Sequence, residues 1–159
     1  MKTPSSEEVL DRSRVSVVDT DSKAEFLEIL TDLLAQSPRV TDRAALREAI
    51  LARESLMSTG IGLGVGVPHV RLDSVTDVAM AVAVSRRNIA DYESLDGQPV
   101  RMAFMIAAGS NQHANYLRLL TRISQQLKEP GFRQRLLACP TADELYVVLA
   151  SVFGKGSPG

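Results

Sequence analysis

At 159 residues, 45% hydrophobic and 23% charged, the chain is long enough for one domain with a single core but not for a catalytic domain beside a separate regulatory one. Its net charge of −1, without a long run of either sign, argues against nucleic-acid binding, which needs a basic surface. One cysteine and two histidines exclude an internal disulfide and a structural Cys/His zinc site.

The two ends of the chain are polar or rich in glycine and proline. Residues 1–8 and 154–159 are therefore expected to be a frayed N-terminus and a flexible tail, which leaves a domain over residues 9–153. The longest apolar run, residues 78–84, is far shorter than the ~20 residues that cross a bilayer. The N-terminus also lacks the apolar stretch of a secretion signal. We expect a cytoplasmic protein with no direct membrane insertion.

A strand and a helix are predicted at the start of the domain. Residues 15–18 are mostly β-branched and favour a strand. Ser22 and Glu25 have the spacing of a capping box, which predicts the beginning of a helix. The expected apolar face of this helix is Phe26, Leu27, Leu30, Leu33 and Leu34.

A second helix is predicted to follow, with Thr41 or Asp42 as its N-cap. Its apolar positions follow the three-and-four spacing of a helix, and the pattern ends near residues 53–56. This prediction places Arg53 at the C-terminal end of the helix.

Between residues 59 and 69, glycine alternates with apolar residues, and this period of two predicts an extended strand. Glycines lower the stability of a strand through their backbone entropy, so we expect another group to approach this backbone closely. That group is either a ligand or a helix packed on the strand face that lacks side chains. The glycines concerned are Gly60, Gly62, Gly64 and Gly66.

The spacing of these glycines does not fit the two common nucleotide-binding motifs. Val65 stands where a dinucleotide fingerprint that starts at Gly60 needs its third glycine. His69 stands where a P-loop that starts at Gly64 needs its second glycine. We therefore expect no nucleotide cofactor.

The second half of the chain is predicted to contain two strands followed by three helices. Residues 77–85 and 100–108 are continuous apolar runs, typical of strands buried on both faces. A helix over residues 112–128, capped by Ser110 or Asn111, should bury Tyr116, Leu117, Leu120, Ile123 and Leu127.

Two shorter helices are expected after it. The first covers residues 132–138, and Pro140 follows its end. Thr141 and Glu144 form a second capping box for the last helix, which should pack through Leu145, Val148, Leu149 and Val152. Strands that alternate with helices predict a single-domain α/β sandwich, with a mostly buried sheet and helices on both of its faces.

The two histidines are each predicted at the end of an element. His69 directly follows Pro68 at the end of the glycine segment, where it is either a surface residue or a reacting group. His113 lies in the first turn of a helix that follows a buried strand, a position that favours anions. Because Leu117 is four residues later, His113 is expected to share the inward face of this helix. The alternative is a capping or core-edge histidine.

If His69, His113 and Arg53 converge, their chemistry suits phosphoryl transfer. A neutral imidazole can act as the nucleophile, while a guanidinium and a second imidazole stabilise charge. The backbone N–H groups of the four glycines could then bind phosphoryl oxygens.

The motif at residues 53–69 closely resembles the active-site segment of type-2 IIA domains of the bacterial phosphoenolpyruvate-dependent phosphotransferase system, the fructose, mannitol and nitrogen-related IIA proteins. The resemblance continues through residues 95–100 and through His113 with the helical leucines behind it. It covers roughly residues 9–150. On this resemblance, His69 matches the phosphorylated histidine, His113 the second active-site histidine and Arg53 the arginine that contacts the phosphoryl group.

The resemblance also implies a mixed sheet between helices and a function as a phosphotransferase. Such a domain accepts a phosphoryl group from the phosphocarrier HPr or its nitrogen-branch counterpart. It passes the group to a IIB domain or uses its phosphorylation state as a regulatory signal toward a target protein. No metal or other cofactor is implied.

Two positions and the length of the chain bear on the branch of the family. Members often carry glycine directly after the active-site histidine, where this chain has Val70, and nitrogen-type members often have proline near Gly109. The absence of a fused IIB or IIC segment favours a stand-alone, nitrogen-type member. The alternative is a regulatory binding module that controls partners without onward sugar phosphorylation. An unrelated hydrolase is disfavoured because Cys139 lies in an apolar helix end and no Gly-x-Ser-x-Gly motif is present.

Overall fold

The computed structural model describes residues 9–153, so the predictions for residues 1–8 and 154–159 lie outside the described residues. Within the described range the chain forms one mixed sheet of six strands. These strands are β1 (Val15–Val18), β2 (Gly60–Gly62), β3 (Val65–Gly66), β4 (His69–Leu72), β5 (Val78–Ile89) and β6 (Val100–Gly109).

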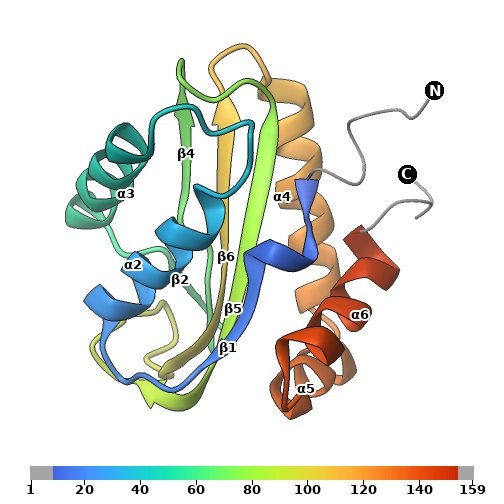
Figure 1. The fold of residues 1–159 in the computed structure, drawn as a ribbon. Coiled ribbons are helices and arrows are strands. Elements are labelled where there is room, and N and C mark those ends of the chain that lie inside the picture. The colour runs from blue at the N-terminus through green and yellow to red at the C-terminus, as the bar shows by residue number, and fades with distance from the viewer. Residues whose placement is uncertain (1–8, 154–159) are drawn as a thin grey trace.

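Helices cover both faces of this sheet. A short 3-10 turn, η1 (Arg12–Arg14), precedes β1. In the described range the α-helices are α2 (Lys23–Leu34), α3 (Arg43–Leu56), α4 (His113–Leu127), α5 (Pro130–Ala138) and α6 (Ala142–Phe153). Figure 1 shows α2 and α3 on one side of the strands and α4, α5 and α6 on the other. The predicted α/β sandwich, with the mixed sheet implied by the resemblance, is confirmed.

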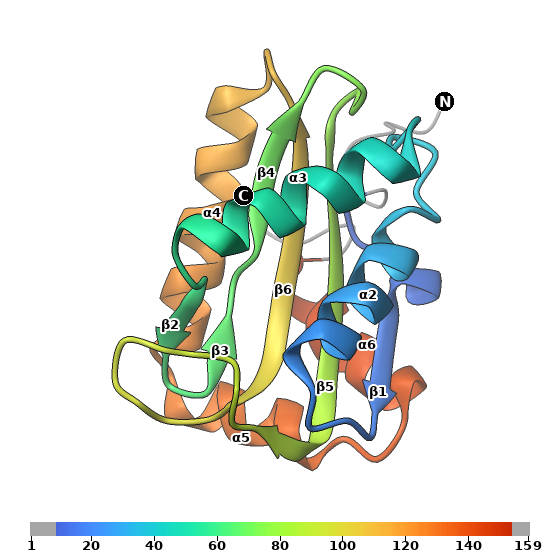
Figure 2. The same cartoon turned by 90° about the vertical axis from the view of Figure 1, so that its left-hand side faces the viewer.

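The sheet is built around the long antiparallel pair of β5 and β6. β1 runs parallel to β5 on one side. On the other side β3 and β4 follow one another along β6, both parallel to it, and β2 pairs only with β3. Figure 2 shows this second edge, where the glycine-rich segment lies between α3 and α4.

The two central strands are buried on both faces, as their continuous apolar runs predict. Side chains alternate between two cores, because successive residues of a strand point to opposite faces. Met80 and Val82 of β5 face the core under α4, α5 and α6. Ala79 and Ala81 face the core under α2 and α3, where their small side chains leave room for these helices. The core therefore fills both layers of the sandwich.

Three helix starts follow the predicted capping chemistry. Ser22 Oγ accepts a hydrogen bond from the Glu25 N–H at 3.2 Å. Asp42, rather than Thr41, caps α3 by accepting from the backbone of its first turn. Thr141 Oγ1 accepts from the Glu144 N–H at 3.2 Å. These bonds satisfy N–H groups that a helix start leaves without intrahelical partners.

The start of α4 differs from the prediction. Gln112 occupies the N-cap position and makes no side-chain capping bond, so neither Ser110 nor Asn111 caps this helix. The Ser110 hydroxyl instead donates to the Asp73 carboxylate at 2.5 Å. This hydrogen bond forms in place of a helix cap and joins the loop before α4 to the end of β4.

The buried stripe of α4 is also displaced from the predicted one. Tyr116, Leu119, Ile123 and Leu127 are buried, whereas the Leu117 side chain is 46% exposed. Leu117 lies about 100° around the helix from Tyr116, which turns it away from the sheet. His113 is itself exposed, one turn before Tyr116, so the expectation that it shares an inward face with Leu117 is wrong.

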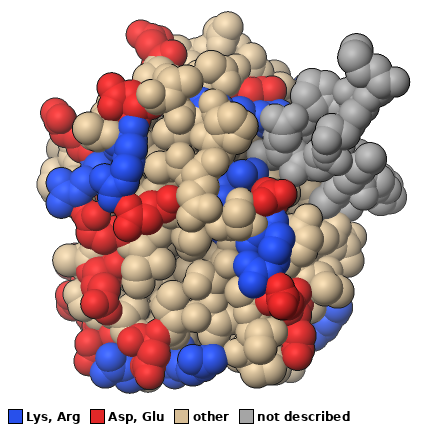
Figure 3. Space-filling model, viewed as in Figure 1, with Lys and Arg blue, Asp and Glu red and all other residues tan. Residues whose placement is uncertain are grey.

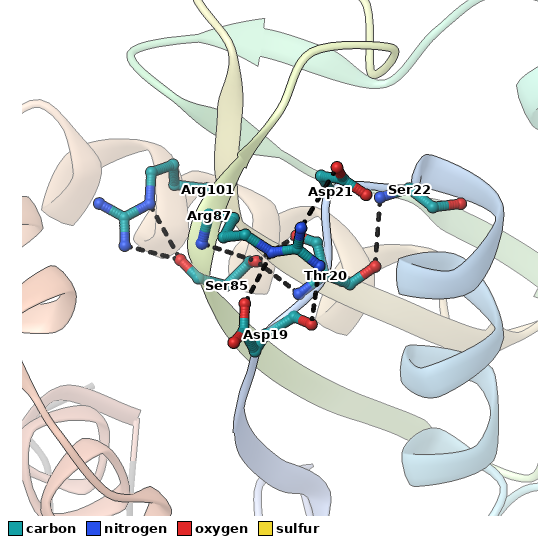
Figure 4. A network of polar contacts seen from close by, with 7 residues as sticks. All are labelled: Asp19, Thr20, Asp21, Ser22, Ser85, Arg87 and Arg101. Carbon is teal, nitrogen blue, oxygen red and sulfur yellow. Dashed lines mark hydrogen bonds and ion pairs between the residues drawn. The ribbon is translucent and has the colours of Figure 1, made fainter.

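A polar network joins the end of β1 to the place where β5 bends (Figure 4). The Arg87 guanidinium donates to the carboxylates of Asp19, at 2.7 Å, and Asp21, at 3.3 Å. Arg101 donates twice to the Ser85 carbonyl, at 2.9 and 2.7 Å. These bonds lie where the register between β5 and β6 shifts. The Arg101 donors thereby supply a partner to the Ser85 carbonyl at this irregularity.

The surface carries charges of both signs. Figure 3 shows acidic and basic side chains interspersed over the face that includes α2 and α3. Arg43 pairs with Asp32, and Arg47 pairs with Glu28, which joins the two helices. Such exposed pairs contribute little to stability. Across residues 9–153, no helix is both long and apolar enough to cross a membrane.

Candidate active site at the edge of the sheet

The glycine-rich segment is a hairpin, so the prediction of one continuous strand is wrong. β2 and β3 pair antiparallel and the chain reverses at Gly62, Leu63 and Gly64, whose φ angles are +98°, +62° and +77°. Glycine adopts such angles without strain, which lets the chain turn between two short strands. The Asp96 carboxylate accepts from the Leu63 N–H at 2.8 Å and fixes the turn. Backbone N–H groups of Leu63 and Gln98 lower the pKa of Asp96.

The loop between β5 and β6, and not a helix, packs against the other two glycines. A Cβ added at Gly60 would lie 2.1 Å from the Glu93 carbonyl oxygen. A Cβ added at Gly66 would lie 2.4 Å from the Tyr92 hydroxyl. The Gly60 N–H donates to Ser58 Oγ at 3.3 Å. The close approach inferred from the sequence is therefore real, but the loop between β5 and β6 makes it.

This packing bears on the prediction that the backbone N–H groups of the four glycines bind phosphoryl oxygens. Gly64 precedes His69 by five residues along an extended segment, a separation of about 16 Å. Gly62 and Gly64 therefore lie at the tip of the hairpin, remote from the histidine. Gly60 and Gly66 are accounted for by the loop that packs on them. The four glycines shape the edge of the sheet, and the binding of phosphoryl oxygens by their N–H groups stays a prediction.

Substitution at Gly60 should lower stability because a backbone carbonyl blocks the added methyl group. We expect Gly60→Ala to reduce the free energy of unfolding by about 1–3 kcal/mol, the usual effect of overpacking. Gly131→Ala is the matched control, since a Cβ at Gly131 in α5 meets no atom within 4 Å. Denaturant titration of both variants measures the difference. Equal midpoints for Gly60→Ala and the unsubstituted chain would contradict the packing described.

Pro68 lies in a short break between β3 and β4, and the pairing with β6 resumes beyond it. β3 and β4 pair with β6 in the same register on both sides of Pro68, and the Pro68 carbonyl accepts from the Ile106 N–H at 2.9 Å. The Val67 N–H still donates to Thr59, at 3.0 Å. Among the described strands, β4 pairs with β6 alone. The edge of β4 that faces away from β6 has no partner among the described strands. Pro68, which has no N–H to donate, is therefore tolerated just before this strand.

His69 begins β4 with its ring partly buried against α4. Its Nδ1 lies 2.6 Å from the Val67 carbonyl oxygen. Because a carbonyl only accepts hydrogen bonds, this contact assigns the proton to Nδ1 and leaves a lone pair on Nε2. The imidazole ring lies 5.9 Å from the Tyr116 ring, centroid to centroid, at a tilt of 47°. The strand and the helix together fix the orientation of the imidazole.

His113 is the first residue of α4, and it contacts an arginine of the neighbouring strand. Its Nδ1 lies 3.1 Å from an Arg71 guanidinium nitrogen. Because a guanidinium only donates, Nδ1 of His113 is the acceptor and Nε2 carries the proton. Arg71 also lies over the Tyr116 ring, with Cζ 5.9 Å from the ring centroid. Tyr116 is therefore flanked by His69 and Arg71.

Arg53 lies in the last turn of α3, as predicted, and reaches the same cluster through its charge. Its guanidinium donates to the Met57 carbonyl at 2.9 Å. Burial raises the pKa of Tyr116, and the guanidinium groups of Arg71 and Arg53 oppose that rise. Of the three residues expected from the sequence, His69 contacts the Tyr116 ring, His113 contacts Arg71, which lies over that ring, and Arg53 acts on Tyr116 through its charge.

Two members of this cluster were not identified from the sequence. Arg71 was not considered, although it follows His69 by two residues and so shares its face of the strand. Tyr116 was expected only as a core residue. Its place in the cluster could have been predicted from its spacing of three residues from His113, because this spacing puts both residues on one side of a helix.

A buried polar network lies next to the cluster, at the end of α3. The Glu54 carboxylate pairs with Lys23 Nζ at 3.0 Å and accepts from the N–H and hydroxyl of Thr59. The Thr59 hydroxyl also lies 2.6 Å from the Tyr92 hydroxyl. Burial and the nearby Glu54 carboxylate raise the pKa of Tyr92. The network joins α2, α3, the hairpin and the loop after β5, and it fixes the end of α3 that carries Arg53.

The groups in this cluster are suited to binding an anion. They are two imidazoles, two guanidinium groups and a phenol, and a guanidinium offers planar pairs of donors to phosphate oxygens. In residues 9–153 no group of three or more His, Cys, Asp or Glu side chains has an arrangement that could hold a metal ion. The available nucleophile is the lone pair on Nε2 of His69.

Comparison with known proteins agrees with this chemistry. The sequence model of the family described as "Phosphoenolpyruvate-dependent sugar phosphotransferase system, EIIA 2" matches residues 8–152. The fructose-specific EIIABC component of Bacillus subtilis is 36% identical over 132 residues, which cover 83% of this chain and 21% of that protein. The chain thus spans about a fifth of the length of that relative.

Two nitrogen regulatory proteins are similar over nearly their whole length. That of Pseudomonas aeruginosa is 33% identical over 147 residues, which cover 92% of this chain and 95% of that protein. The crystal structure of the nitrogen regulatory protein IIA-Ntr of Neisseria meningitidis superimposes with a TM-score of 0.78 at 29% identity. This match covers 89% of this chain and 97% of that one.

Proposed function

Because the chain belongs to the EIIA type-2 family of the phosphoenolpyruvate-dependent sugar phosphotransferase system, we propose that it is a phosphocarrier with His69 as the phosphoryl acceptor. It receives the group from an HPr-type carrier. It then passes the group to a IIB domain or uses its phosphorylation state to control a target protein.

The observation that carries this proposal is the hydrogen bond between Nδ1 of His69 and the Val67 carbonyl, 2.6 Å long. It leaves the Nε2 lone pair free to attack phosphorus, while the bond from phosphorus to the donor breaks and its electron pair stays on the donor. The phosphorylated ring keeps its proton on Nδ1 and gains positive charge. Its hydrogen bond to the Val67 carbonyl then becomes charge-assisted and stronger.

The surrounding groups supply charge and orientation in this proposal. Arg53 neutralises the phosphoryl oxygens as they move toward His69. His113 is the first residue of α4, so it lies at the positive end of the helix and offers an Nε2–H donor. We assign His113 a helper role, in which it assists the transfer without accepting the group.

An exposed apolar surface that extends from the end of α3, which carries Arg53, along the hairpin fits a protein partner. Large apolar side chains are exposed at the end of α3, on the hairpin and in the loop that packs on it: Leu56 (83%), Met57 (67%), Ile61 (40%), Leu63 (49%) and Leu95 (84%). Figure 2 shows these three segments side by side. Exposed apolar patches of this kind mark interaction sites. We propose that the donor carrier and the IIB acceptor dock here in turn.

A IIB domain as acceptor is supported by the B. subtilis relative, whose name joins EIIA with EIIB and EIIC. A nitrogen-type role is supported by the similarity to nitrogen regulatory proteins over nearly the whole length of both chains. The higher identity to the fructose-specific component favours the sugar branch as the second candidate.

Phosphoryl transfer in solution tests the proposal. The chain is incubated with labelled phosphoenolpyruvate, enzyme I and either HPr or its nitrogen-branch counterpart, and a IIB domain is added afterwards. We expect one phosphoryl group per chain, labile in acid and stable in base, with faster uptake from the nitrogen-branch carrier. Absence of label with both carriers, or label that survives acid, would rule out a phosphohistidine. Uptake without onward transfer to IIB would favour the regulatory module.

A further inference from the structure

Arg71 is an exposed arginine of β4 that the proposed chemistry does not yet use. We propose that Arg71 is a second guanidinium of the phosphoryl site, which binds oxygens of the group carried by His69 and is held in place by His113 and Tyr116. This inference rests on the proposed function and adds a residue to its site.

The strand places Arg71 beside the acceptor. Residues two apart in a strand point to the same face, and they are separated by about 6.6 Å along it. His69 and Arg71 therefore share the face toward α4, whereas Val70 between them is buried in the opposite core, under α2 and α3. An extended arginine side chain spans a distance of this size. Arg71 can reach a group bound to Nε2 of His69 without any movement of the backbone.

Its partners hold the guanidinium but leave most of its donors available. In the part of the chain that the structure describes, the hydrogen bond of the Arg71 side chain is the one to Nδ1 of His113. Its planar group also lies over the Tyr116 ring, a favourable cation–π contact. One of five N–H donors is thus used, and the others suit phosphoryl oxygens.

Other arginines of the described chain are engaged differently. Arg87 is bound by the carboxylates of Asp19 and Asp21 (Figure 4), and Arg39 lies 3.5 Å from Asp77. Within residues 9–153, no carboxylate lies within ion-pair distance of Arg71, which contacts an imidazole and a phenol ring instead. An arginine positioned by neutral groups keeps its full charge for an anion. Arg53 and Arg71 both act on the pKa of Tyr116, so the two charges approach the same ring, which also contacts His69.

The arrangement also gives His113 a defined part in positioning. Its neutral ring, with the proton on Nε2, is what accepts the hydrogen bond from Arg71. Loss of the His113 ring would free the guanidinium to move into solvent. Removal of His113 should therefore slow phosphorylation partly by displacing the Arg71 guanidinium. The effects of the His113 and Arg71 substitutions on the rate should then not be additive.

The test uses the full chain, two variants of Arg71 with matched comparisons, and two phosphoryl donors. Arg71→Met removes the charge and all donors. Arg71→Gln keeps an N–H that can bond His113 but lacks the charge, and it preserves the test if the methionine variant does not fold. Arg118→Met is the matched control, because Arg118 is an exposed arginine of α4 whose guanidinium contacts Asn115. Phosphorylation rates are measured with the HPr-type carrier and with phosphoramidate, a small donor that needs no docking surface.

We expect both Arg71 variants to be phosphorylated at least about tenfold more slowly by either donor, the effect of losing one charged hydrogen bond. Arg118→Met should stay within about twofold of the unsubstituted chain. His113→Ala should slow the Arg71→Gln variant by a smaller factor than it slows the unsubstituted chain. This non-additivity is the readout that a merely structural role for Arg71 would not produce.

Each contrary outcome has a separate meaning. If the unsubstituted chain takes no phosphoryl group from either donor, the proposed function fails and this inference fails with it. If the chain is phosphorylated and the Arg71 variants match it with both donors, only the inference on Arg71 is overturned. Slow uptake from the carrier with normal uptake from phosphoramidate would assign Arg71 to partner docking, and that result also overturns the inference.

Discussion

His69→Ala is expected to lose all acid-labile phosphoryl uptake. The reason is that Nε2 of His69 keeps an unprotonated lone pair, while Nδ1 is bound to the Val67 carbonyl. An alanine side chain offers no nucleophile at this position. Intact mass after incubation with phosphoenolpyruvate, enzyme I and the carrier measures the uptake directly.

The second histidine provides the comparison for this result. His113→Ala should still take up one phosphoryl group, more slowly, and should pass it to a IIB domain at a reduced rate. Single-turnover transfer in both directions separates these steps. Acid-labile label that persists in His69→Ala but disappears in a folded His113→Ala would exchange the roles of the two residues.

Arg53→Lys is expected to reduce the rate of phosphorylation by about 10²–10³-fold, the usual effect of losing one donor to a transition-state oxygen. Lysine keeps the positive charge but not the planar pair of donors that fits phosphate oxygens. It also loses the geometry in which the guanidinium donates to the Met57 carbonyl. The rate of label uptake from the carrier is the measurement.

Arg47→Lys on the same helix is the control for this change. Arg47 is exposed and pairs with Glu28 on α2, where a lysine can replace it. This variant should be phosphorylated at a rate within about twofold of the unsubstituted chain. A similarly small effect for Arg53→Lys would remove Arg53 from the site and leave it as an arginine that ends a helix.

Much of the fold was readable from local patterns in the sequence. The apolar runs of β5 and β6 indicated strands buried on both faces, because a strand covered by helices on each side has no polar face. Ser22 and Thr141 marked the starts of α2 and α6, since their side chains bond N–H groups only three residues away. Such features depend on neighbours in the sequence. They can therefore be predicted without knowledge of the fold.

The hairpin could not be predicted in this way. Alternation of glycine with apolar residues is compatible with one long strand and with two short ones. The turn is set by Asp96, which lies 33 residues further along the chain and binds the Leu63 N–H. The loop residues that contact Gly60 and Gly66 lie 33 and 26 residues further along the chain. Only folding brings these segments together, so the reason for the glycines became visible only in the structure.

The candidate site likewise combines features that the sequence predicts with features that only the fold sets. By itself, the sequence indicated the candidate reacting side chains: it placed His69 and His113 at the ends of elements and Arg53 at the end of a helix. The tertiary structure decided which of their nitrogen atoms is free and which residues complete the cluster. Parallel pairing of β4 with β6 carries Arg71 to His113, and packing of α4 on the sheet sets Tyr116 against His69. These contacts join residues 42 to 47 positions apart, and a pattern of period two or 3.6 has no information at that separation.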